Sequence, residues 1–267
     1  MNQLNIKSLG YRSDLIFPNF DGVLKDRGTY FVIETPSNPH FHWGNFLLFK
    51  VPPAKGDLKV WSKLFKMEFT NPEIKHLTFG WDTINGEKGS SDEFVSAGFI
   101  ETEQAVLVAT SVIANKNLNS DLVVRPLNNS NEWLAALENQ IACRQEIYSY
   151  DDYKLFKASQ FQRYQNMEKA GLGFWFGAFI GDTLVGDLGI FSDGDIGRFQ
   201  NVGTNPEYRR KGICGTLVYK ASQFAFQKMG LKTLVMVADD DGNARRVYES
   251  VGFEPKEKQS GVSWWQS

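Results

Sequence analysis

The feature that most constrains the fold of this chain is a strand that passes through a basic loop into a long helix. Residues 198–204 form the predicted strand, and Pro206 interrupts its pairing. The run Arg-Arg-Lys-Gly at 209–212 then opens a helix that extends to about Met229. Strands that feed helices through short loops are typical of α/β folds. The sequence therefore predicts a mixed α/β unit around this segment.

The loop at the start of that helix has the chemistry of an anion site. The first turn of a helix leaves several backbone N–H groups without partners and carries partial positive charge. Arg209, Arg210 and Lys211 add formal charge. Gly212 and Gly215 let the backbone approach a ligand closely. These features predict a cradle for a pyrophosphate, although the loop has neither the Walker A ending nor the Rossmann glycine pattern.

Hydrophobic patterning predicts further elements around this loop. In the C-terminal part the expected strands are 122–125, 173–180, 183–191, 198–204, 232–237 and a last one through Trp264 and Trp265, and the expected helices are about 131–141, 152–169, 213–229 and 243–250. A polar, turn-forming stretch at 113–121 precedes them. We therefore expect two domains, residues 1–117 and residues 118–267, the second of them a mixed-sheet α/β (α+β) domain.

The N-terminal part repeats the order of the second half of the C-terminal part. Strands at 30–33, 45–51 and 76–81 accompany a helix that follows the Lys-Gly pair at 55–56. Pro52 and Gly98 have the same separation as Pro206 and Gly252, and Phe follows the glycine in both cases. We interpret this as a weak internal repeat. The alternative is that two α/β segments share a helix-Gly-Phe ending by chance.

Composition and charge exclude several classes of protein. The net charge of −2 argues against a broad surface for nucleic acid. Two cysteines, Cys143 and Cys214, make neither a disulfide framework nor a CxxC zinc site. The start of the chain has no basic and apolar leader, and no segment reaches 18 apolar residues. We expect a cytoplasmic protein with no nucleic-acid or membrane partner, and the oligomeric state is open.

Two runs of residues carry a resemblance to a known family. Residues 209–214 (Arg-Arg-Lys-Gly-Ile-Cys) resemble the Gln/Arg-x-x-Gly-x-Gly/Ala motif of the GNAT superfamily of acyl-CoA-dependent N-acetyltransferases. Residues 243–253 (Asn-Ala-Arg-Arg-Val-Tyr-Glu-Ser-Val-Gly-Phe) resemble its Asn-x-x-Ala-x-x-x-Tyr-x-x-x-Gly-Phe segment. The resemblance covers about residues 121–267. The N-terminal part resembles a degenerate copy, in which Pro52–Gly56 is too short and too weakly basic for a second cradle.

The resemblance implies acetyl-CoA as the cofactor and a small-molecule or peptide amine as the acceptor, which attacks directly in a ternary complex. Strand backbone would pair with the pantetheine arm, the loop N–H groups would hold the pyrophosphate, and Asn243 would bind near the pantetheine end. The residues so assigned are Val202, Gly203, Thr204, Arg209, Arg210, Lys211, Gly212, Ile213, Cys214, Gly215, Thr216 and Asn243. Tyr248 would protonate the departing thiolate, and a strand N–H near Val202 would stabilise the oxyanion.

The sequence leaves the general base open. The strand 198–204 carries no Glu or Asp, where many members of the superfamily place a carboxylate. Asp187, on the preceding strand, is one candidate, and water-mediated deprotonation is the other. The structural alternative for Asp187 is a solvent-facing carboxylate.

Three further features have structural alternatives beside functional ones. Cys214 stands where the superfamily prefers Gly or Ala; its pKa at a helix N-terminus could be depressed, and the alternative is a small residue that faces the core. His40 and His42 could line an acceptor cleft or belong to a packed loop, and we expect no metal. The acidic run 239–241 is interpreted as a turn that caps the helix at Asn243.

Three functions are compared. The first is an acetyl-CoA-dependent N-acetyltransferase, whose N-terminal half shapes the acceptor site or braces the catalytic half. The second is a non-catalytic acyl-CoA-binding or scaffold protein on the same fold, because fold alone does not fix function. The third, a tandem aminoacyltransferase that uses aminoacyl-tRNA, is disfavoured by the near-neutral charge and the intact loop.

Overall fold

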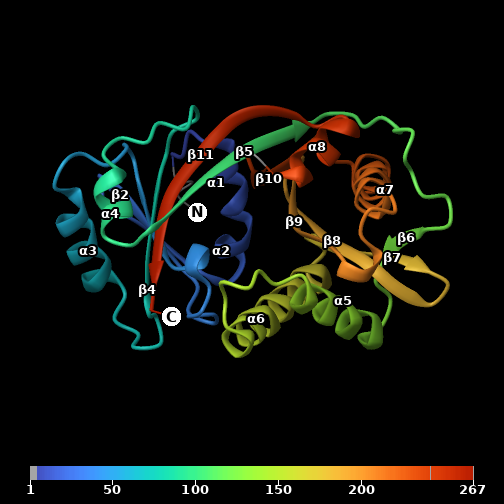
Figure 1. Cartoon of the computed structure of the whole chain (residues 1–267), viewed down its shortest axis with the longest axis horizontal. Helices are drawn as coiled ribbons and strands as arrows, with labels where there is room; N and C mark the ends of the chain where they lie inside the picture. The colour runs from blue at the N-terminus through green and yellow to red at the C-terminus, as the bar shows by residue number, and fades with distance from the viewer. Residues whose placement is uncertain (1–4, 241, 267) are drawn as a thin grey trace. The chain divides into compact units, whose positions relative to one another are not determined.

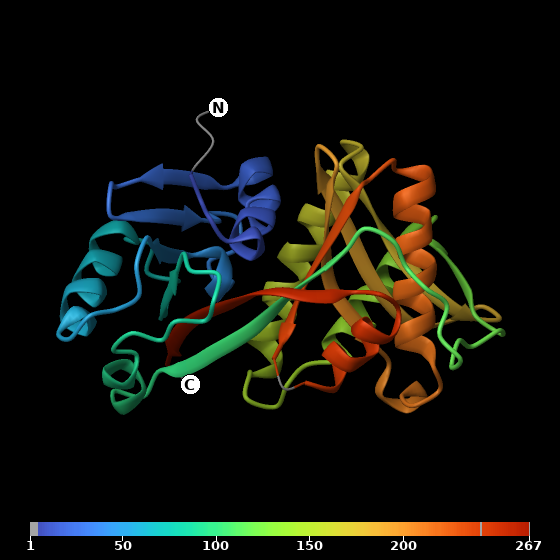
Figure 2. The same ribbon diagram turned by 90° about the horizontal axis from the view of Figure 1, so that it is seen from above.

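The computed structural model describes residues 5–240 and 242–266 and divides into two compact units. The N-terminal unit holds Met1–Val106 together with Lys256–Ser267, and the C-terminal unit holds Leu107–Pro255. Figures 1 and 2 show their elements, coloured along the chain. Within the described ranges, no helix is both long and apolar enough to cross a membrane. The expected domains 1–117 and 118–267 stay a prediction.

The N-terminal unit is built on a mixed sheet in the strand order β1-β2-β3-β4-β11-β5. Its elements are α1 (Leu9–Asp14), α2 (Ile16–Asp21), β1 (Val23–Asp26), β2 (Tyr30–Glu34), η1 (His42–Gly44), β3 (Phe46–Phe49), α3 (Asp57–Glu68), β4 (His76–Trp81), α4 (Asp92–Ser96), most of β5 (Ile100–Ala109) and most of β11 (Glu254–Trp265). Strands β3 and β4 are parallel, whereas β11 runs antiparallel to β4. The last strand of the chain therefore completes the sheet of the N-terminal unit, whereas the sequence assigned it to the C-terminal part.

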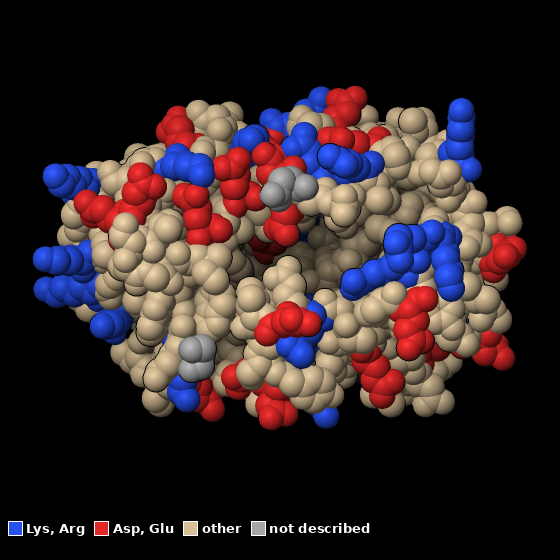
Figure 3. All heavy atoms as spheres, in the orientation of Figure 1, with Lys and Arg blue, Asp and Glu red and all other residues tan. Residues whose placement is uncertain are grey.

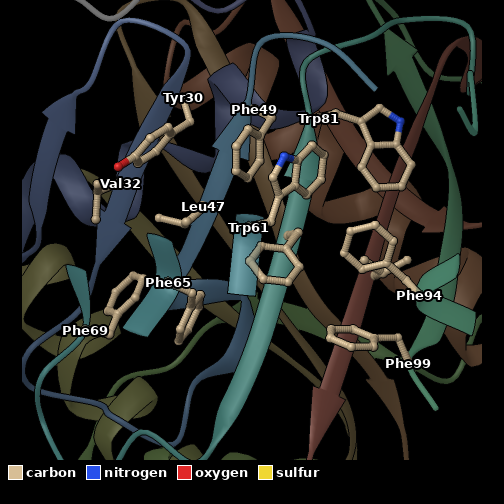
Figure 4. Close-up of a cluster of buried hydrophobic side chains, with 12 residues drawn as sticks. Tyr30, Val32, Leu47, Phe49, Trp61, Phe65, Phe69, Trp81, Phe94 and Phe99 are labelled. Atoms are coloured by element: carbon tan, nitrogen blue, oxygen red, sulfur yellow. The ribbon is translucent and has the colours of Figure 1, made fainter. Parts of the chain in front are cut away.

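Aromatic side chains fill the core between α3, α4 and this sheet (Figure 4). The indole of Trp61 stacks on Phe49 with ring centroids 3.6 Å apart, and Phe79 and Phe94 meet Trp61 edge-on or tilted at 5.7 and 5.5 Å. Trp61 and Phe65 lie one turn apart on the buried face of α3. Burial of such large rings makes this cluster the main hydrophobic core of the unit.

The C-terminal unit has the sheet order β10-β9-β8-β7-β6, with the end of β5 beside β10. Its elements are β6 (Val123–Pro126), α5 (Ser130–Ala142), α6 (Tyr150–Lys169), β7 (Gly173–Ile180), β8 (Thr183–Asp193), β9 (Ile196–Thr204), η2 (Pro206–Tyr208), α7 (Ile213–Lys228), β10 (Thr233–Asp239) and α8 (Asn243–Ser250). Pairing from β6 to β9 is antiparallel, and β9 and β10 are parallel. The predicted mixed-sheet α/β fold is confirmed.

Helices cover both faces of this second sheet. Helices α5 and α6 lie on one face and α7 on the other (Figure 1). Successive residues of strand β8 face opposite sides of the sheet. A side chain at Gly186 would meet Ile213 and Leu217 of α7, whereas the next residue, Asp187, contacts α5. Both faces of the central strands are therefore buried.

Candidate functional site

The parallel strands β9 and β10 lie side by side only at their starts. Their register runs from the Ile196–Thr233 pair to the Arg198–Val235 pair. Beyond it β9 continues to Thr204 and β10 to Asp239, and no pairing joins these described stretches. On its other edge β9 stays paired with β8 as far as Thr204. The two strands therefore diverge, and the edge of β9 that faces β10 keeps backbone groups free of the ladder.

A bulge re-aims β9 within this divergent stretch. Its register against β8 shifts so that Asn201 and Val202 together oppose a single residue, Leu188. Asn201 has a positive φ of 48°, a conformation that costs a non-glycine residue about 1 kcal/mol or more. Val202, Gly203 and Thr204 follow the bulge, so the residues expected to pair with a pantetheine arm lie at the divergence.

The start of α7 supplies an unsatisfied row of donors. Gly212 is the N-cap, in the left-handed conformation at φ 73°, and Arg210 also has a positive φ of 62°. Thr216 donates its N–H to the carbonyl of Gly212 over 3.1 Å. Among the described residues no acceptor meets the N–H groups of Ile213, Cys214 and Gly215. A left-handed residue followed by a helical one forms a nest of N–H groups that suits an anion.

Basic side chains surround this nest. Arg209, Arg210 and Lys211 are exposed. The Nε of Arg209 lies 3.4 Å from the carbonyl oxygen of Thr204, which ties the loop to the end of β9. The ammonium of Lys211 lies 4.8 Å from the ring centroid of Tyr208. Figure 3 shows Lys and Arg side chains gathered on this face of the molecule in the region of α7.

The asparagine-rich segment 115–119 packs against the same loop, which the sequence analysis did not foresee. Asn119 lies far from α7 in the sequence and was not expected to contact it. Its N–H nevertheless donates to Thr216 Oγ1 over 2.7 Å, and its Nδ2 donates to the Lys211 carbonyl over 2.9 Å. A Cβ at Gly212 would overlap the carbonyl oxygen of Asn117. Gly212 is thus required both by its backbone conformation and by this close approach. The segment was interpreted only as a boundary because it has no hydrophobic pattern.

Tyr248 lies on the buried face of the short helix α8. Its side chain is 5% exposed, and its hydroxyl has no hydrogen bond to any described residue. Burial, followed by the nearby Cys214 and Asp239, raises the pKa of Tyr248 well above its ordinary value. The phenol therefore lies between the start of α7 and the end of β10 and stays protonated across the physiological pH range.

Asn243 is less well supported. It is the exposed first residue of α8, and Gly242 caps the helix without a side-chain hydrogen bond. The family pattern places its Asn seven residues before the Tyr, whereas Asn243 stands five before Tyr248. Residue 241 has the pattern's spacing and lies outside the described residues. The expected cap from the acidic run is wrong for its described part, because Asp239 gives only its carbonyl, to the N–H of Gly242, and Asp240 pairs with Arg245.

Cys214 does not have the reactive thiol that a helix N-terminus suggested. Desolvation raises the pKa of its thiol to about 12. A buried thiolate would lose its hydration, and this cost exceeds the attraction of the helix dipole. The small, core-facing interpretation is therefore the one that the structure favours.

Asp187 is buried rather than solvent-facing, which corrects the structural alternative considered for it. Its carboxylate accepts hydrogen bonds from Asn139 Nδ2 at 2.8 Å and Gln140 Nε2 at 2.5 Å. Burial raises the pKa of Asp187 to about 7, and the two amides and the charge of Lys157 oppose that rise. Lys157 is also buried, and desolvation lowers its pKa to about 7. Sequence reasoning missed Asn139, Gln140 and Lys157, because polar residues on a helix read as a solvated face.

The N-terminal unit lacks the features of this site. Its helix α3 also begins after a left-handed glycine, Gly56, but Glu93 accepts the N–H of Gly56 over 2.9 Å and Asp57 accepts that of Ala54 over 2.8 Å. Strands β3 and β4 stay paired to their ends, at Phe49 and Trp81. Counting from the matched glycines of the repeat, Phe94 stands in the position of Tyr248. In the described part of this unit, carboxylates thus accept two N–H groups of the loop before α3, the two parallel strands do not diverge, and a phenyl ring stands in the position of the phenol.

The histidines belong to the packing of the N-terminal unit. The ring of His42 lies 4.4 Å from His76 and 5.1 Å from Trp265, measured between centroids. His76 Nε2 is 2.9 Å from the carbonyl oxygen of Asn45. Burial lowers the pKa of His42 to about 3 and that of His76 to about 4. Across the described residues no group of three His, Cys, Asp or Glu side chains is arranged to hold a metal ion.

A helix N-terminus with free N–H groups is the arrangement that the resemblance to acyl-CoA-dependent transferases implied, whereas the divergence of β9 and β10 was not foreseen. Residues 133–253 match the sequence profile of the acetyltransferase (GNAT) family. The resemblance expected from the sequence is thereby confirmed for this segment. No curated protein sequence matches the chain closely enough to count as a relative.

Solved structures share the fold over most of the chain. A conserved protein of unknown function from Staphylococcus epidermidis has a TM-score of 0.73 at 15% identity, covering 93% of this chain and 96% of its own. A GCN5-related N-acetyltransferase from Kribbella flavida has a TM-score of 0.63 at 16% identity, covering 94% and 92%. A tandem GNAT protein from the clavulanic acid biosynthesis pathway has a TM-score of 0.52 at 11% identity, covering 79% and 70%. These low identities show the shared fold alone.

Proposed function

We propose that this protein is an acetyl-CoA-dependent N-acetyltransferase that moves an acetyl group to the primary amine of a small molecule or peptide. The observation that carries the proposal is the divergence of β9 and β10 beside three unsatisfied N–H groups of α7. Free strand edges suit the amide-bearing pantetheine arm, and the nest suits a pyrophosphate. Location in the cytoplasm stays a prediction from the sequence.

The residues present fit the cofactor. Gly212 has no side chain to obstruct the nest, and its left-handed φ points consecutive N–H groups the same way. The exposed Arg209, Arg210 and Lys211 supply the positive charge that a diphosphate needs. On this proposal the N–H groups from Arg210 through Gly215 hold the diphosphate, and Val202, Gly203 and Thr204 pair with the arm. The predicted range 209–216 is too wide at both ends, because the N–H groups of Arg209 and Thr216 donate to the carbonyls of Pro206 and Gly212. The bound cofactor supplies an acyl thioester that an amine can attack.

Two groups of the chain act on the charges that develop. The N–H of Val202, next to the bulge at Asn201, stabilises the oxyanion on the former carbonyl. Tyr248 gives its phenolic proton to the departing thiolate, because its raised pKa keeps the proton in place until then. The amine loses its proton to water or, through water, to Asp187, a buried residue of β8.

Calorimetric titration with acetyl-CoA, desulfo-CoA and ATP tests the cofactor. We expect saturable binding of one acetyl-CoA per chain, binding of desulfo-CoA, and none of ATP. One site per chain is expected because the loop before α3 is shorter and less basic than the loop before α7, and carboxylates accept its N–H groups at Ala54 and Gly56. Absence of binding to the folded protein would refute the cradle.

Thiol release in the presence of an amine panel then tests catalysis. The panel contains amino acids, aminoglycoside-type amines, simple alkylamines and peptide N-termini. Amine-dependent release of CoA supports the transferase. Tight one-site binding without release for any amine would favour the alternative, a non-catalytic acyl-CoA-binding protein.

A further inference from the structure

A buried polar cluster lies between α5, α6 and the strands β8 and β9 of the C-terminal unit. Its members are Asn139, Gln140, Lys157, Gln160, Tyr164, Asp187 and Asn201. Buried polar groups are costly unless they are paired, so a cluster of this size implies a role beyond filling space. One end of it is the carboxylate of Asp187, and the other is the bulge in β9.

Gln140 joins these two ends. Its Nε2 donates to Asp187 Oδ1 over 2.5 Å and to the carbonyl oxygen of Asn201 over 2.6 Å. An amide NH₂ has two hydrogens, so both donors of this group are used. The close fit is local, because a Cβ at Gly203 would lie 2.6 Å from the same nitrogen.

Asn201 is held in its left-handed conformation from the side chain as well. Its Nδ2 donates to Gln160 Oε1 over 2.9 Å and to the Tyr164 hydroxyl over 3.1 Å. Gln160 Oε1 also accepts from the ammonium of Lys157 over 3.0 Å. A strained residue persists only where its surroundings over-determine it, and here α5 holds the carbonyl while α6 holds the side chain.

We propose that Gln140 is a positioning residue for acyl transfer: by bridging Asp187 to the carbonyl of Asn201, it fixes the bulge that aims the N–H of Val202 at the acyl carbonyl. The inference rests on the proposed function. Gln140 touches no reacting atom and acts through the backbone of β9. Through this bridge, the orientation of the Val202 N–H on β9 depends on the carboxylate of Asp187 on β8.

The bridge also couples β9 to pH. A protonated Asp187 is a weaker acceptor, so acid loosens the grip of Gln140 on the carboxyl group. The titratable groups that face Asp187 are Lys157 and Tyr153 of α6 and Cys143 at the end of α5, and Arg209 acts on Cys143. Because burial raises the pKa of Asp187 to about 7, we expect kcat to fall as pH drops below 7.

The test compares Gln140→Met with Asn139→Leu. Each variant removes one hydrogen-bond donor from Asp187, but of the two side chains only Gln140 also donates a hydrogen bond to a carbonyl of β9. For Gln140→Met we expect a loss of about 100-fold in kcat, as for a misplaced reacting group, with the KM for acetyl-CoA nearly unchanged. For Asn139→Leu we expect a loss of less than about fivefold, because the bulge keeps its anchor.

Amide hydrogen exchange of β9 in the protein without cofactor supplies a readout that needs no activity. Exchange at residues 201–203 should quicken about tenfold or more in Gln140→Met and stay near wild type in Asn139→Leu. Should Gln140→Met fail to fold, Gln140→Asn replaces it, because the shorter amide cannot reach both partners. Equal exchange and equal kcat losses in the two variants would overturn the proposal.

The exchange measurement also separates the two proposals. A wild-type protein that fails to release CoA refutes the proposed function, whereas the exchange comparison still decides whether Gln140 fixes β9. An active wild type with unchanged β9 exchange in Gln140→Met refutes the positioning role alone.

Discussion

Replacing Gly212 by alanine measures how tightly the loop before α7 is built. Gly212 has φ 73°, where an L-residue pays about 1–2 kcal/mol. The new Cβ would also overlap the carbonyl of Asn117, so the segment 115–119 must move. That movement breaks the two hydrogen bonds of Asn119 to Thr216 and Lys211, each worth about 1 kcal/mol. We expect a total loss of about 3–4 kcal/mol in the free energy of unfolding.

Gly230, at the other end of α7, gives a matched control. Its φ is 71°, and no atom lies within 4 Å of a Cβ built on it. Gly230→Ala therefore pays the conformational cost of about 1–2 kcal/mol alone. Urea denaturation gives both free energies, and calorimetry gives the acetyl-CoA affinity. We expect about tenfold or more weaker binding for Gly212→Ala only, since the nest is displaced in that variant. Equal destabilisation of the two variants would refute the contribution of the Asn117 contact.

Two further outcomes follow from the buried groups. Tyr248→Phe should lower kcat by about 10²–10⁴-fold with little change in acetyl-CoA affinity. Steady-state rates and calorimetry measure both quantities, and Tyr219→Phe on α7 is the control. Unchanged turnover in Tyr248→Phe removes this residue from the mechanism. His42 and His76 are held neutral, with pKa values lowered to about 3 and about 4, so their contribution is complete above pH 6.5 and is lost as pH falls toward those values. At pH 5 each costs about 2 kcal/mol, so the loss of stability between pH 7 and pH 5, measured by urea denaturation, should be about 2 kcal/mol smaller in His42→Phe than in the wild type. An equal pH dependence in that variant contradicts this account.

Local sequence patterns were sufficient for the elements around the cradle. Pro206, the basic run and Gly212 determine the strand, loop and helix, because a proline, a left-handed glycine and free N–H groups act within a few residues. The same holds for α8 and its Tyr248. The weak repeat also predicted that the N-terminal part is a degenerate copy without a second cradle, although the roles of Glu93 and Asp57 at its loop were not foreseen.

The pairing of the last strand was decided by tertiary structure alone. Residues 254–265 have strand character in the sequence, but their partner β4 lies about two thirds of the chain length earlier. Strand pairing satisfies backbone groups with whichever edge the fold presents, and sequence distance does not record that choice. Asn139, Gln140, Lys157 and Asp187 were hidden for a related reason: a polar side chain shows its burial only once the neighbouring elements pack on it. The sequence determined the resemblance to the family and the strand, loop and helix that build the predicted cradle, whereas packing decided how the bulge beside them is held.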